Sequence, residues 1–240
     1  MARPAATDAM DLTDRTALVT GASSGIGEAT ARALAAEGCA VALAARREDR
    51  LEGIADDIDG PTLVVPTDVT DEAAAADAVA ATRERFGGLD LLVNNAGIAR
   101  GGPVAEADLE DLHQTVRVNL EGVMNVTHAA LPALLDAEAA DVVTVSSMSA
   151  RFPQEGGSAY SASKFGVNGF CRSLRKEMRD EQVRVTIVMP GPVVTELNDW
   201  AHWEGRALAP ADVAESIVFT ASRPPHVEIP DITVNSTDKH

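Results

Sequence analysis

The sequence predicts an α/β fold in which a doubly wound parallel sheet of about seven strands is covered by helices on both faces. Short apolar runs alternate along the whole chain with helical stretches long enough to connect parallel strands. The first apolar run is followed by a glycine-rich turn and a helix. No linker rich in Pro, Gly or Ser interrupts the 240 residues, of which 45% are hydrophobic. We therefore expect a single domain over residues 1–240, with a flexible tail at 1–11 and a polar tail at 235–240.

The first half of the chain supplies four strands and three helices. Apolar runs predict strands at Thr16–Thr20, Ala40–Ala44, Leu63–Val65 and Leu89–Val93. Helical patterns are expected at Glu28–Glu37, at Glu48–Ile58 and from about Asp71 to Phe86. Gly38 stops the first of these helices, and Asp71 is of the residue type that caps a helix.

The second half repeats this alternation. A long helix is predicted from about Asp108 to Leu135 and another from about Ser158 to Met178. Strands are expected at Val142–Val145, Val183–Val188 and Glu228–Val234. Pro210 opens a last helix that runs to Ala221, with Val213, Ile217 and Thr220 on one face.

The glycine turn after the first strand predicts a phosphate site. Its residues are Gly21, Ser23, Ser24, Gly25, Ile26 and Gly27. Glycine allows a tight turn and a close approach of the backbone to a pyrophosphate, which then rests at the start of a helix. Such turns also follow strands in proteins that bind no ligand. With a ligand, the unit is of the Rossmann type, the fold that binds dinucleotides.

Two arginines at the end of the second strand bear on which dinucleotide binds. NAD binders usually place a carboxylate there for the adenosine ribose, whereas this chain has Ala45 followed by Arg46 and Arg47. Guanidinium groups bind phosphate through charge-assisted hydrogen bonds. The pattern therefore favours NADP(H) over NAD(H), the alternative being that both arginines only begin a solvated helix.

Tyr160 is the only tyrosine of the chain, and Lys164 follows it by four residues. On a helix this spacing brings an ammonium beside a phenol, which favours the phenolate and lowers the pKa of the tyrosine. A tyrosine tuned in this way can exchange protons near neutral pH. A solvated pair on a helix surface has the same spacing.

Composition excludes several classes of function. A net charge of −17 argues against nucleic acid and anionic membranes as partners. The chain has no membrane-length apolar run and no signal-peptide pattern, so we expect a cytoplasmic protein. The acidity fits a salt-rich cytoplasm or an alanine-rich, GC-biased genome. Cys39 and Cys171 lack a CxxC partner and are predicted to be small buried side chains, and no metal site is expected.

Together these motifs resemble the short-chain dehydrogenase/reductase family over nearly the whole chain, from about Leu12 to Val234. The resemblance rests on residues 20–27, Asn94–Gly97, Asn119, Ser147, residues 160–164 and Pro190–Thr195, in the order and spacing of the family. The end of the chain, residues 208–229, is similar to bacterial and archaeal members that include 3-hydroxy acid dehydrogenases and clavaldehyde reductase. Those members use NADP(H) and tend to be tetramers.

The resemblance implies a carbonyl–alcohol oxidoreductase and assigns roles to four residues. Tyr160 would exchange a proton with the substrate oxygen, and Ser147 would hold and polarise that oxygen. Lys164 would lower the pKa of Tyr160 and bind the nicotinamide ribose, while Asn119 would position a water that connects Lys164 to solvent. From the residues alone, Ser147 could be an ordinary turn residue and Asn119 a buried residue satisfied by backbone.

The resemblance also implies further cofactor contacts. These are Asp68, Val69, Asn95, Ala96 and Gly97 on the adenosine side, and Pro190, Gly191, Val193 and Thr195 over the nicotinamide, besides Tyr160 and Lys164. They follow predicted strands at their carboxyl ends, where doubly wound sheets bind ligands. The asparagines could equally serve to brace a turn.

The substrate is less defined by the sequence. Its pocket is expected to include Tyr160, Ser147, Ser149, Ile98, and residues 151–154, where Arg151 could meet a substrate carboxylate or remain a solvated loop residue. The segment Glu196–Leu208 is shorter than in many relatives, and its Trp200 and Trp203 could form an apolar lid or pack on the last helix. A 3-hydroxy acid, an aldehyde or a ketone fits these features.

Small residues on the tyrosine helix, Ala162, Gly166 and Gly169, would allow helices to approach closely across a subunit interface. We therefore expect a homo-oligomer, a dimer or a tetramer. The alternative function is an oligomeric cofactor-binding protein with little catalysis. Such a protein would usually have lost one of Asn119, Ser147, Tyr160 or Lys164, and all four are present.

Overall fold

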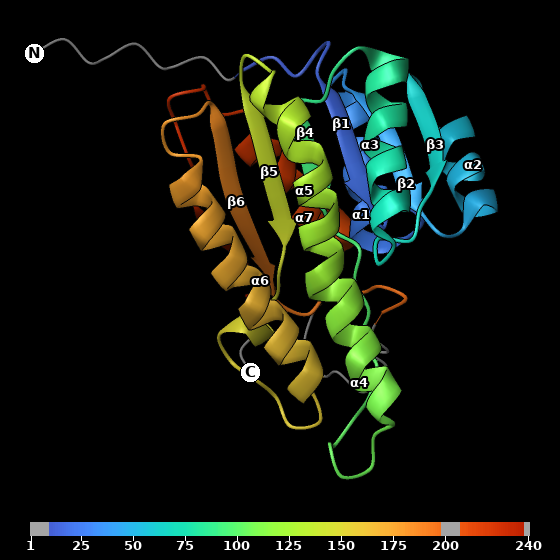
Figure 1. Ribbon diagram of the computed structural model, residues 1–240, viewed down its shortest axis with the longest axis vertical. Coiled ribbons are helices and arrows are strands. Elements are labelled where there is room, and N and C mark those ends of the chain that lie inside the picture. The colour runs from blue at the N-terminus through green and yellow to red at the C-terminus, as the bar shows by residue number, and fades with distance from the viewer. Residues whose placement is uncertain (1–9, 198–206, 238–240) are drawn as a thin grey trace, which may run out of the picture.

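One parallel sheet runs through the computed structural model, which describes residues 10–197 and 207–237 (Figure 1). Its seven strands lie in the order β3-β2-β1-β4-β5-β6-β7, and every neighbouring pair is parallel. The strands are β1 Thr16–Thr20, β2 Ala40–Ala45, β3 Thr62–Pro66, β4 Leu91–Asn94, β5 Ala140–Val145, β6 Val183–Pro190 and β7 Asp231–Val234. The order reverses between β1 and β4, as in a doubly wound sheet, so the predicted fold class is confirmed.

Helices cover both faces of this sheet. They are α1 Gly25–Ala36, α2 Glu48–Asp56, α3 Glu72–Phe86, α4 Leu109–Val116, α5 Gly122–Leu135, α6 Ser158–Glu177 and α7 Pro210–Ala221, with the short turns η1 Arg117–Glu121 and η2 Met148–Ala150. One apolar cluster joins the sheet to α3, α5 and α6, which lie in front of it in Figure 1. A second cluster joins the opposite face to α1, α2 and α7. The described residues contain no helix long and apolar enough to cross a membrane.

Local signals placed several element boundaries correctly. Thr16–Thr20 and Pro210–Ala221 have the predicted bounds. The Asp71 carboxylate accepts hydrogen bonds from the amides of Ala73 and Ala74, which confirms it as the cap of α3. Cys39 and Cys171 are buried free thiols, as predicted, and burial raises the pKa of Cys39 to about 11.

The predicted long helix over residues 108–135 is present as a continuous helical stretch over 109–135, but it is not α-helical throughout. Between α4 and α5 the chain forms a π-helical turn at Arg117–Glu121, and this turn contains Asn119. A π-helical turn inserts an extra residue into a helix, and such turns occur frequently at functional sites. The apolar pattern does not reveal it, because helical spacing continues on either side.

Other boundaries also differ from the prediction. α1 begins at Gly25, three residues before Glu28. β4 begins at Leu91 and not at Leu89, and the carboxylate of Asp90 accepts a hydrogen bond from the Thr16 amide at 2.8 Å. β7 is limited to Asp231–Val234. Near the chain ends, the Met10 amide donates to the Ser222 carbonyl at 2.7 Å, and a Cβ on Gly191 would lie 2.1 Å from Asn235 Oδ1.

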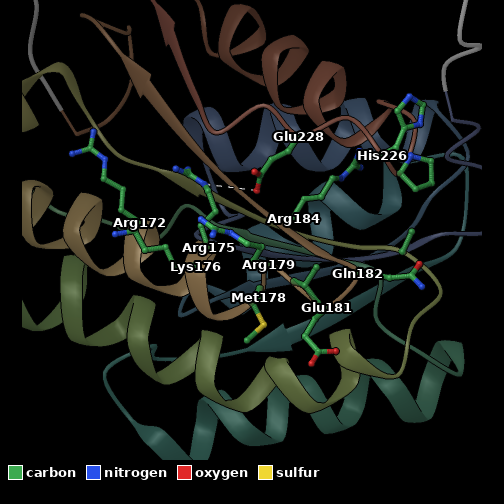
Figure 2. Close-up of a pocket in the computed structure, with 13 residues that line it drawn as sticks. Arg172, Arg175, Lys176, Met178, Arg179, Glu181, Gln182, Arg184, His226 and Glu228 are labelled. Carbon is green, nitrogen blue, oxygen red and sulfur yellow. Dashed lines mark ion pairs between the residues drawn. The ribbon is translucent and has the colours of Figure 1, made fainter.

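A hollow of about 540 Å³ lies beside the amino end of β6, away from the carboxyl ends of the strands (Figure 2). Its basic side chains are Arg172, Arg175, Lys176, Arg179 and Arg184. Two acids also line it: Glu228, which lies 3.8 Å from Arg175 Nε, and Glu181. Arg175 further donates to the Val185 carbonyl at 2.8 Å. Through these contacts, Arg175 joins α6 to β6, so the side chains around the hollow have a structural role.

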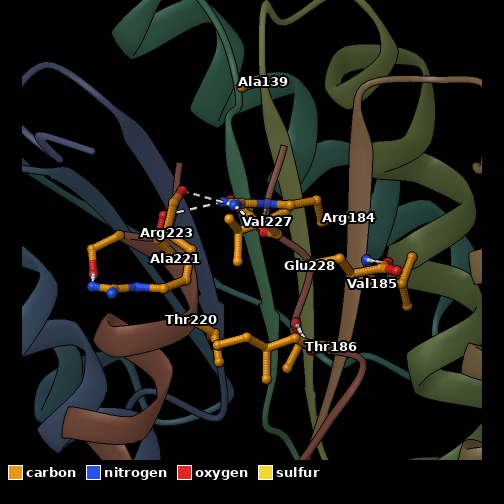
Figure 3. Close-up of polar contacts among 12 residues, drawn as sticks. Ala139, Arg184, Val185, Thr186, Thr220, Ala221, Arg223, Val227 and Glu228 are labelled. Carbon is orange, nitrogen blue, oxygen red and sulfur yellow. Dashed lines mark hydrogen bonds and ion pairs between the residues drawn. The ribbon is translucent and has the colours of Figure 1, made fainter. Parts of the chain in front are cut away.

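A buried ion cluster lies at the same end of the sheet. Asp141 on β5 accepts two hydrogen bonds from Arg184 on β6, both 2.8 Å, and one from Arg15 at 3.1 Å. The guanidinium of Arg184 also donates to carbonyls of the chain after α7, including Arg223 and Val227 at 2.7 and 2.9 Å (Figure 3). The cluster therefore ties β5, β6 and the end of α7 together through charge-assisted bonds.

Candidate active site

Most of the predicted site residues gather at the carboxyl edge of the sheet. The glycine turn follows β1, Arg46 and Arg47 follow β2, Asn95 follows β4, and Ser147 follows β5. This edge is where ligands bind in doubly wound sheets. The strands of a parallel sheet end on the same side, so segments far apart in the sequence meet there.

The glycine turn has no room for side chains at its centre. Gly21 has a φ of +65°, and a Cβ on Gly27 would lie 2.2 Å from the Gly21 carbonyl oxygen and 2.5 Å from Asn95 Nδ2. The backbone of the turn therefore packs directly on the loop after β4. A turn that is closely packed at its base and leads into the amino terminus of α1 fits the phosphates of a dinucleotide.

This packing predicts a large effect of Gly27→Ala. The new Cβ would overlap backbone atoms that have no flexible side chain to move, so the turn must shift. We expect a loss of stability of about 1–3 kcal/mol and a loss of dinucleotide binding. Urea unfolding and a binding titration would measure both. Gly53→Ala on α2 is the matched control, since no described atom lies within 4 Å of its Cβ position; equal behaviour of the two variants would contradict the prediction.

Thr20 and Asn95 hold the turn against the loop after β4. The hydroxyl of Thr20 accepts from the amides of Asn95 and Ala96 at 3.0 and 3.1 Å, and Asn95 Nδ2 donates to the Thr20 carbonyl at 3.0 Å. Asn95 thus stabilises the turn through hydrogen bonds. This structural role is the alternative that the sequence left open for the asparagines. The role of Thr20 was not predicted, although its place at the start of the glycine motif could have indicated it.

Tyr160, Ser147 and Lys164 come together beside β5. The side chain of Ser147 lies close enough to Tyr160 to influence its pKa, and Lys164 Nζ lies 5.7 Å from the centroid of the tyrosine ring. Lys164 is buried and donates to the Val145 carbonyl at 2.9 Å. The pair is therefore not a solvated surface pair.

The pKa values in this site differ from the expectation of a lowered tyrosine pKa. Burial raises the pKa of Tyr160, and the Ser147 side chain opposes this shift. Burial also lowers the pKa of Lys164 to about 8, because a desolvated ammonium is less stable. In the protein alone, desolvation outweighs the attraction between ammonium and phenolate.

Asn119 braces the site through its side chain. Its amide exchanges two hydrogen bonds with the backbone of Ile98, at 2.8 and 2.9 Å, and donates to Ser163 Oγ at 3.1 Å. Ser163 in turn donates to the Tyr160 carbonyl at 2.7 Å. Sequence reasoning missed Ser163, which joins the π-helical turn to the tyrosine helix. A Cβ on Gly97 would lie 3.3 Å from Asn119 Oδ1 and 3.8 Å from Lys164 Nζ, so Gly97 also borders this group.

Arg47 contacts the glycine turn, whereas Arg46 has no hydrogen bond to it. Arg47 donates to Ser23 Oγ at 3.1 Å, to Ser24 Oγ at 2.9 Å and to the Glu196 carboxylate at 2.9 Å. Arg46 is exposed and forms no hydrogen bond or ion pair with another described residue. Glu196 was not predicted as a contact of Arg47, because the two are 149 residues apart in the sequence.

The other residues predicted to contact the cofactor lie at the same edge of the sheet and differ in how far they are exposed. Asp68 accepts from Thr70, through its amide and its hydroxyl, at 3.0 and 2.8 Å. Val69 is buried in the core, and a Cβ on Gly122 would lie 2.6 Å from it. Pro190 ends β6, Val193 is buried beside Leu208, and Ile26 packs on the core below the glycine turn.

The predicted substrate residues lie around η2. The Ser149 amide donates to Ser147 Oγ at 3.1 Å, while Arg151 is exposed. Trp200 and Trp203 lie outside the described residues. Among the residues that are described, no three His, Cys, Asp or Glu side chains form a group that could hold a metal ion.

Comparison with known proteins identifies the family. The model of the family described as short chain dehydrogenase matches residues 15–204, and the chain belongs to this family of oxidoreductases. An uncharacterized oxidoreductase of Staphylococcus saprophyticus is 36% identical over 230 residues, covering 94% of this chain and 98% of the relative.

Solved structures agree over nearly the whole chain. A 3-ketoacyl-(acyl-carrier-protein) reductase from Brucella melitensis, complexed with NADH, has a TM-score of 0.87 at 29% identity and covers 93% of this chain and 98% of its own. The closed form of serine dehydrogenase, complexed with NADP+, has a TM-score of 0.86 at 31% identity, with 91% and 94% coverage.

Proposed function

We propose that this protein is an NADP(H)-dependent oxidoreductase that interconverts a carbonyl and a primary or secondary alcohol. The observation that carries the proposal is the convergence of Tyr160, Ser147 and Lys164 on one edge of the sheet with the glycine turn. Family membership and two neighbours that are complexed with nicotinamide dinucleotides support it. The closed base of the glycine turn fits such a cofactor.

The residues of the site have the chemistry that this reaction needs. When bound, the nicotinamide supplies or accepts the hydride. In the reductive direction Tyr160 donates its proton to the carbonyl oxygen, where negative charge develops, and Ser147 donates a second hydrogen bond. Lys164 holds positive charge beside Tyr160 and favours its return to the phenolate form. The side chain of Asn119 hydrogen-bonds to Ile98 and Ser163, so we propose that it acts by positioning the backbone of this site.

The preference for NADP(H) rests on Arg46, Arg47 and Ser23. Arg47 lies on the glycine turn with two serine hydroxyls within hydrogen-bonding distance, and Arg46 is free to turn toward the same place. A 2′-phosphate could accept hydrogen bonds from each of these groups. The short side chain of Ala45 offers no carboxylate to an adenosine ribose.

Arg47→Ala is therefore expected to weaken NADPH binding much more than NADH binding. A hydrogen bond to a charged group contributes about 1.5–3 kcal/mol, which corresponds to roughly 10- to 150-fold in the Kd for NADPH. Arg46→Ala should act in the same direction. Fluorescence titration with both cofactors measures the effect. Arg179→Ala, which removes an exposed arginine at the other end of the molecule, should change neither Kd; equal weakening of NADPH and NADH by Arg47→Ala would exclude the phosphate assignment.

A 3-hydroxy acid is the substrate class that we propose to test first. Serine is itself a 3-hydroxy acid, so the likeness to serine dehydrogenase supports this class, as does the resemblance of residues 208–229. Purified protein would be assayed for NADPH oxidation with aldehydes, ketones and 3-keto acids and esters, and for NADP+ reduction with 3-hydroxy acids. Tight NADPH binding without turnover of any of them would favour a cofactor-binding protein instead.

We further propose a cytoplasmic homo-oligomer, a dimer or a tetramer. Exposed apolar side chains on α5 and α6, including Met124, Leu135 and Phe165, support an interface there. Gly166 serves packing within the chain, because its Cβ would lie 2.8 Å from Leu120, whereas Gly169 has no described atom within 4 Å of its Cβ position. The charge of −17 supports the proposal of a salt-rich cytoplasm.

A further inference from the structure

The segment after β6 places a carboxylate on the glycine turn. Glu196 Oε2 lies 2.9 Å from Arg47 Nη1, and Glu196 Oε1 lies 3.8 Å from Arg50 Nη2. Arg47, with Ser24, lowers the pKa of Glu196. Glu196 is therefore an anion that pairs with two arginines, and one of these, Arg47, also donates to Ser24 Oγ on the glycine turn at 2.9 Å.

Arg47 is one of the groups that the proposed function assigns to the adenosine 2′-phosphate. We infer that Glu196 occupies this anion site in the cofactor-free protein, so that a 2′-phosphate must displace the Glu196 carboxylate in order to bind Arg47. The inference rests on the proposed NADP(H) site. It makes Glu196 a residue that sets cofactor specificity, because only a ligand with a 2′-phosphate has to compete with it.

The packing of Thr195, the residue before Glu196, supports competition between the Glu196 carboxylate and a 2′-phosphate. Thr195 Cγ2 lies 3.1 Å from the position of a Cβ on Gly25, so the segment lies directly against the start of α1. Further back, the segment is held by two backbone hydrogen bonds, from Val194 to the Leu208 carbonyl at 2.9 Å and from Leu208 to the Pro192 carbonyl at 2.8 Å. Glu196 can thus leave Arg47 while residues 192–194 stay in place.

The exposure of the pair sets the size of the effect. The side chains of Arg47 and Glu196 are 45% and 54% exposed, and exposed ion pairs contribute little because water screens them. Competition by the Glu196 carboxylate should therefore weaken the binding of a 2′-phosphate ligand by only a moderate factor. We expect Glu196→Gln to tighten binding of a 2′-phosphate ligand about two- to fivefold.

The experiment uses two probes that differ only in the 2′-phosphate, adenosine 2′,5′-bisphosphate and adenosine 5′-monophosphate. Calorimetric titration would give both Kd values for the wild type, Glu196→Gln and the matched control Glu52→Gln. Glu52 lies on α2, is exposed and has no contact with Arg47, so its variant removes the same charge from the same neighbourhood. Glu196→Gln should tighten the bisphosphate selectively, Glu52→Gln should not, and the gain should vanish in the Arg47→Ala background.

Each other outcome overturns the inference in a recognisable way. If the wild-type protein binds the bisphosphate no more tightly than the monophosphate, the proposed NADP(H) site is refuted, and the inference is refuted with it. If the wild type has this preference and Glu196→Gln leaves the bisphosphate Kd unchanged or weakens it, the competition is refuted and the proposed function stands. Equal tightening by Glu196→Gln and Glu52→Gln would show a general charge effect, and the inference would likewise fail.

Discussion

Replacement of Tyr160 by phenylalanine is expected to lower turnover by about 100- to 10,000-fold, the usual contribution of a general acid or base. The variant loses the phenolic hydroxyl beside Ser147, while the ring and its packing beside Lys164 remain. The cofactor site on the glycine turn is untouched, so the Kd for NADPH should not change. Turnover would be measured with the best substrate of the panel, and the Kd by fluorescence titration.

Ser173→Ala is the matched control for this experiment. It also removes a single hydroxyl from α6, but at an exposed position two turns beyond Lys164 on the same helix. It should leave both turnover and the Kd unchanged. Full turnover by Tyr160→Phe would exclude Tyr160 as the proton donor, and loss of NADPH binding together with turnover would show that its role is structural.

Replacement of Asp141 by asparagine is expected to have the largest effect on stability. Asp141 is buried and lies between two guanidiniums, those of Arg15 and Arg184, which are themselves 10% exposed. Removing its charge leaves two positive groups buried without a counter-charge. Breaking a buried ion pair in this way costs about 3–5 kcal/mol of unfolding free energy.

Urea unfolding at one fixed protein concentration would measure the loss. Asp57→Asn provides the comparison, because Asp57 also pairs with an arginine, Arg32 at 3.2 Å, but is 69% exposed. Exposed pairs contribute only about 0.2–1 kcal/mol. A loss for Asp141→Asn no larger than that for Asp57→Asn would contradict the interpretation of the buried cluster as a stabilising joint between strands.

The sequence predicted those features that depend on neighbouring residues. Apolar runs gave the strands, Asp71 and Pro210 gave the starts of two helices, and the glycine spacing gave the turn after β1. In each case the signal and the structure that it specifies lie within a few residues of each other. The π-helical turn at Arg117–Glu121 was not predictable in this way, because helical spacing continues on both sides of it.

The sequence predicted that Tyr160, Ser147 and Lys164 lie together, but it predicted only some of their contacts. Tyr160, Ser147 and Lys164 do meet beside β5. The direction of the Tyr160 pKa was wrong for the protein alone, because spacing along a helix says nothing about how deeply a phenol is buried. Asn119, expected as a water-binding residue, has its side chain engaged with Ile98 and Ser163.

By itself, the sequence predicted the doubly wound sheet, the glycine turn and the set of polar residues that meet beside β5. Only the tertiary structure decided that Arg47, not Arg46, contacts the turn, that Glu196 pairs with it, and that Asp141 joins Arg15 to Arg184. The physical reason is the separation in sequence between the residues that interact. Secondary structure and turns follow from local sterics and apolar periodicity, whereas ion pairing and burial depend on which distant segments the folded sheet brings together.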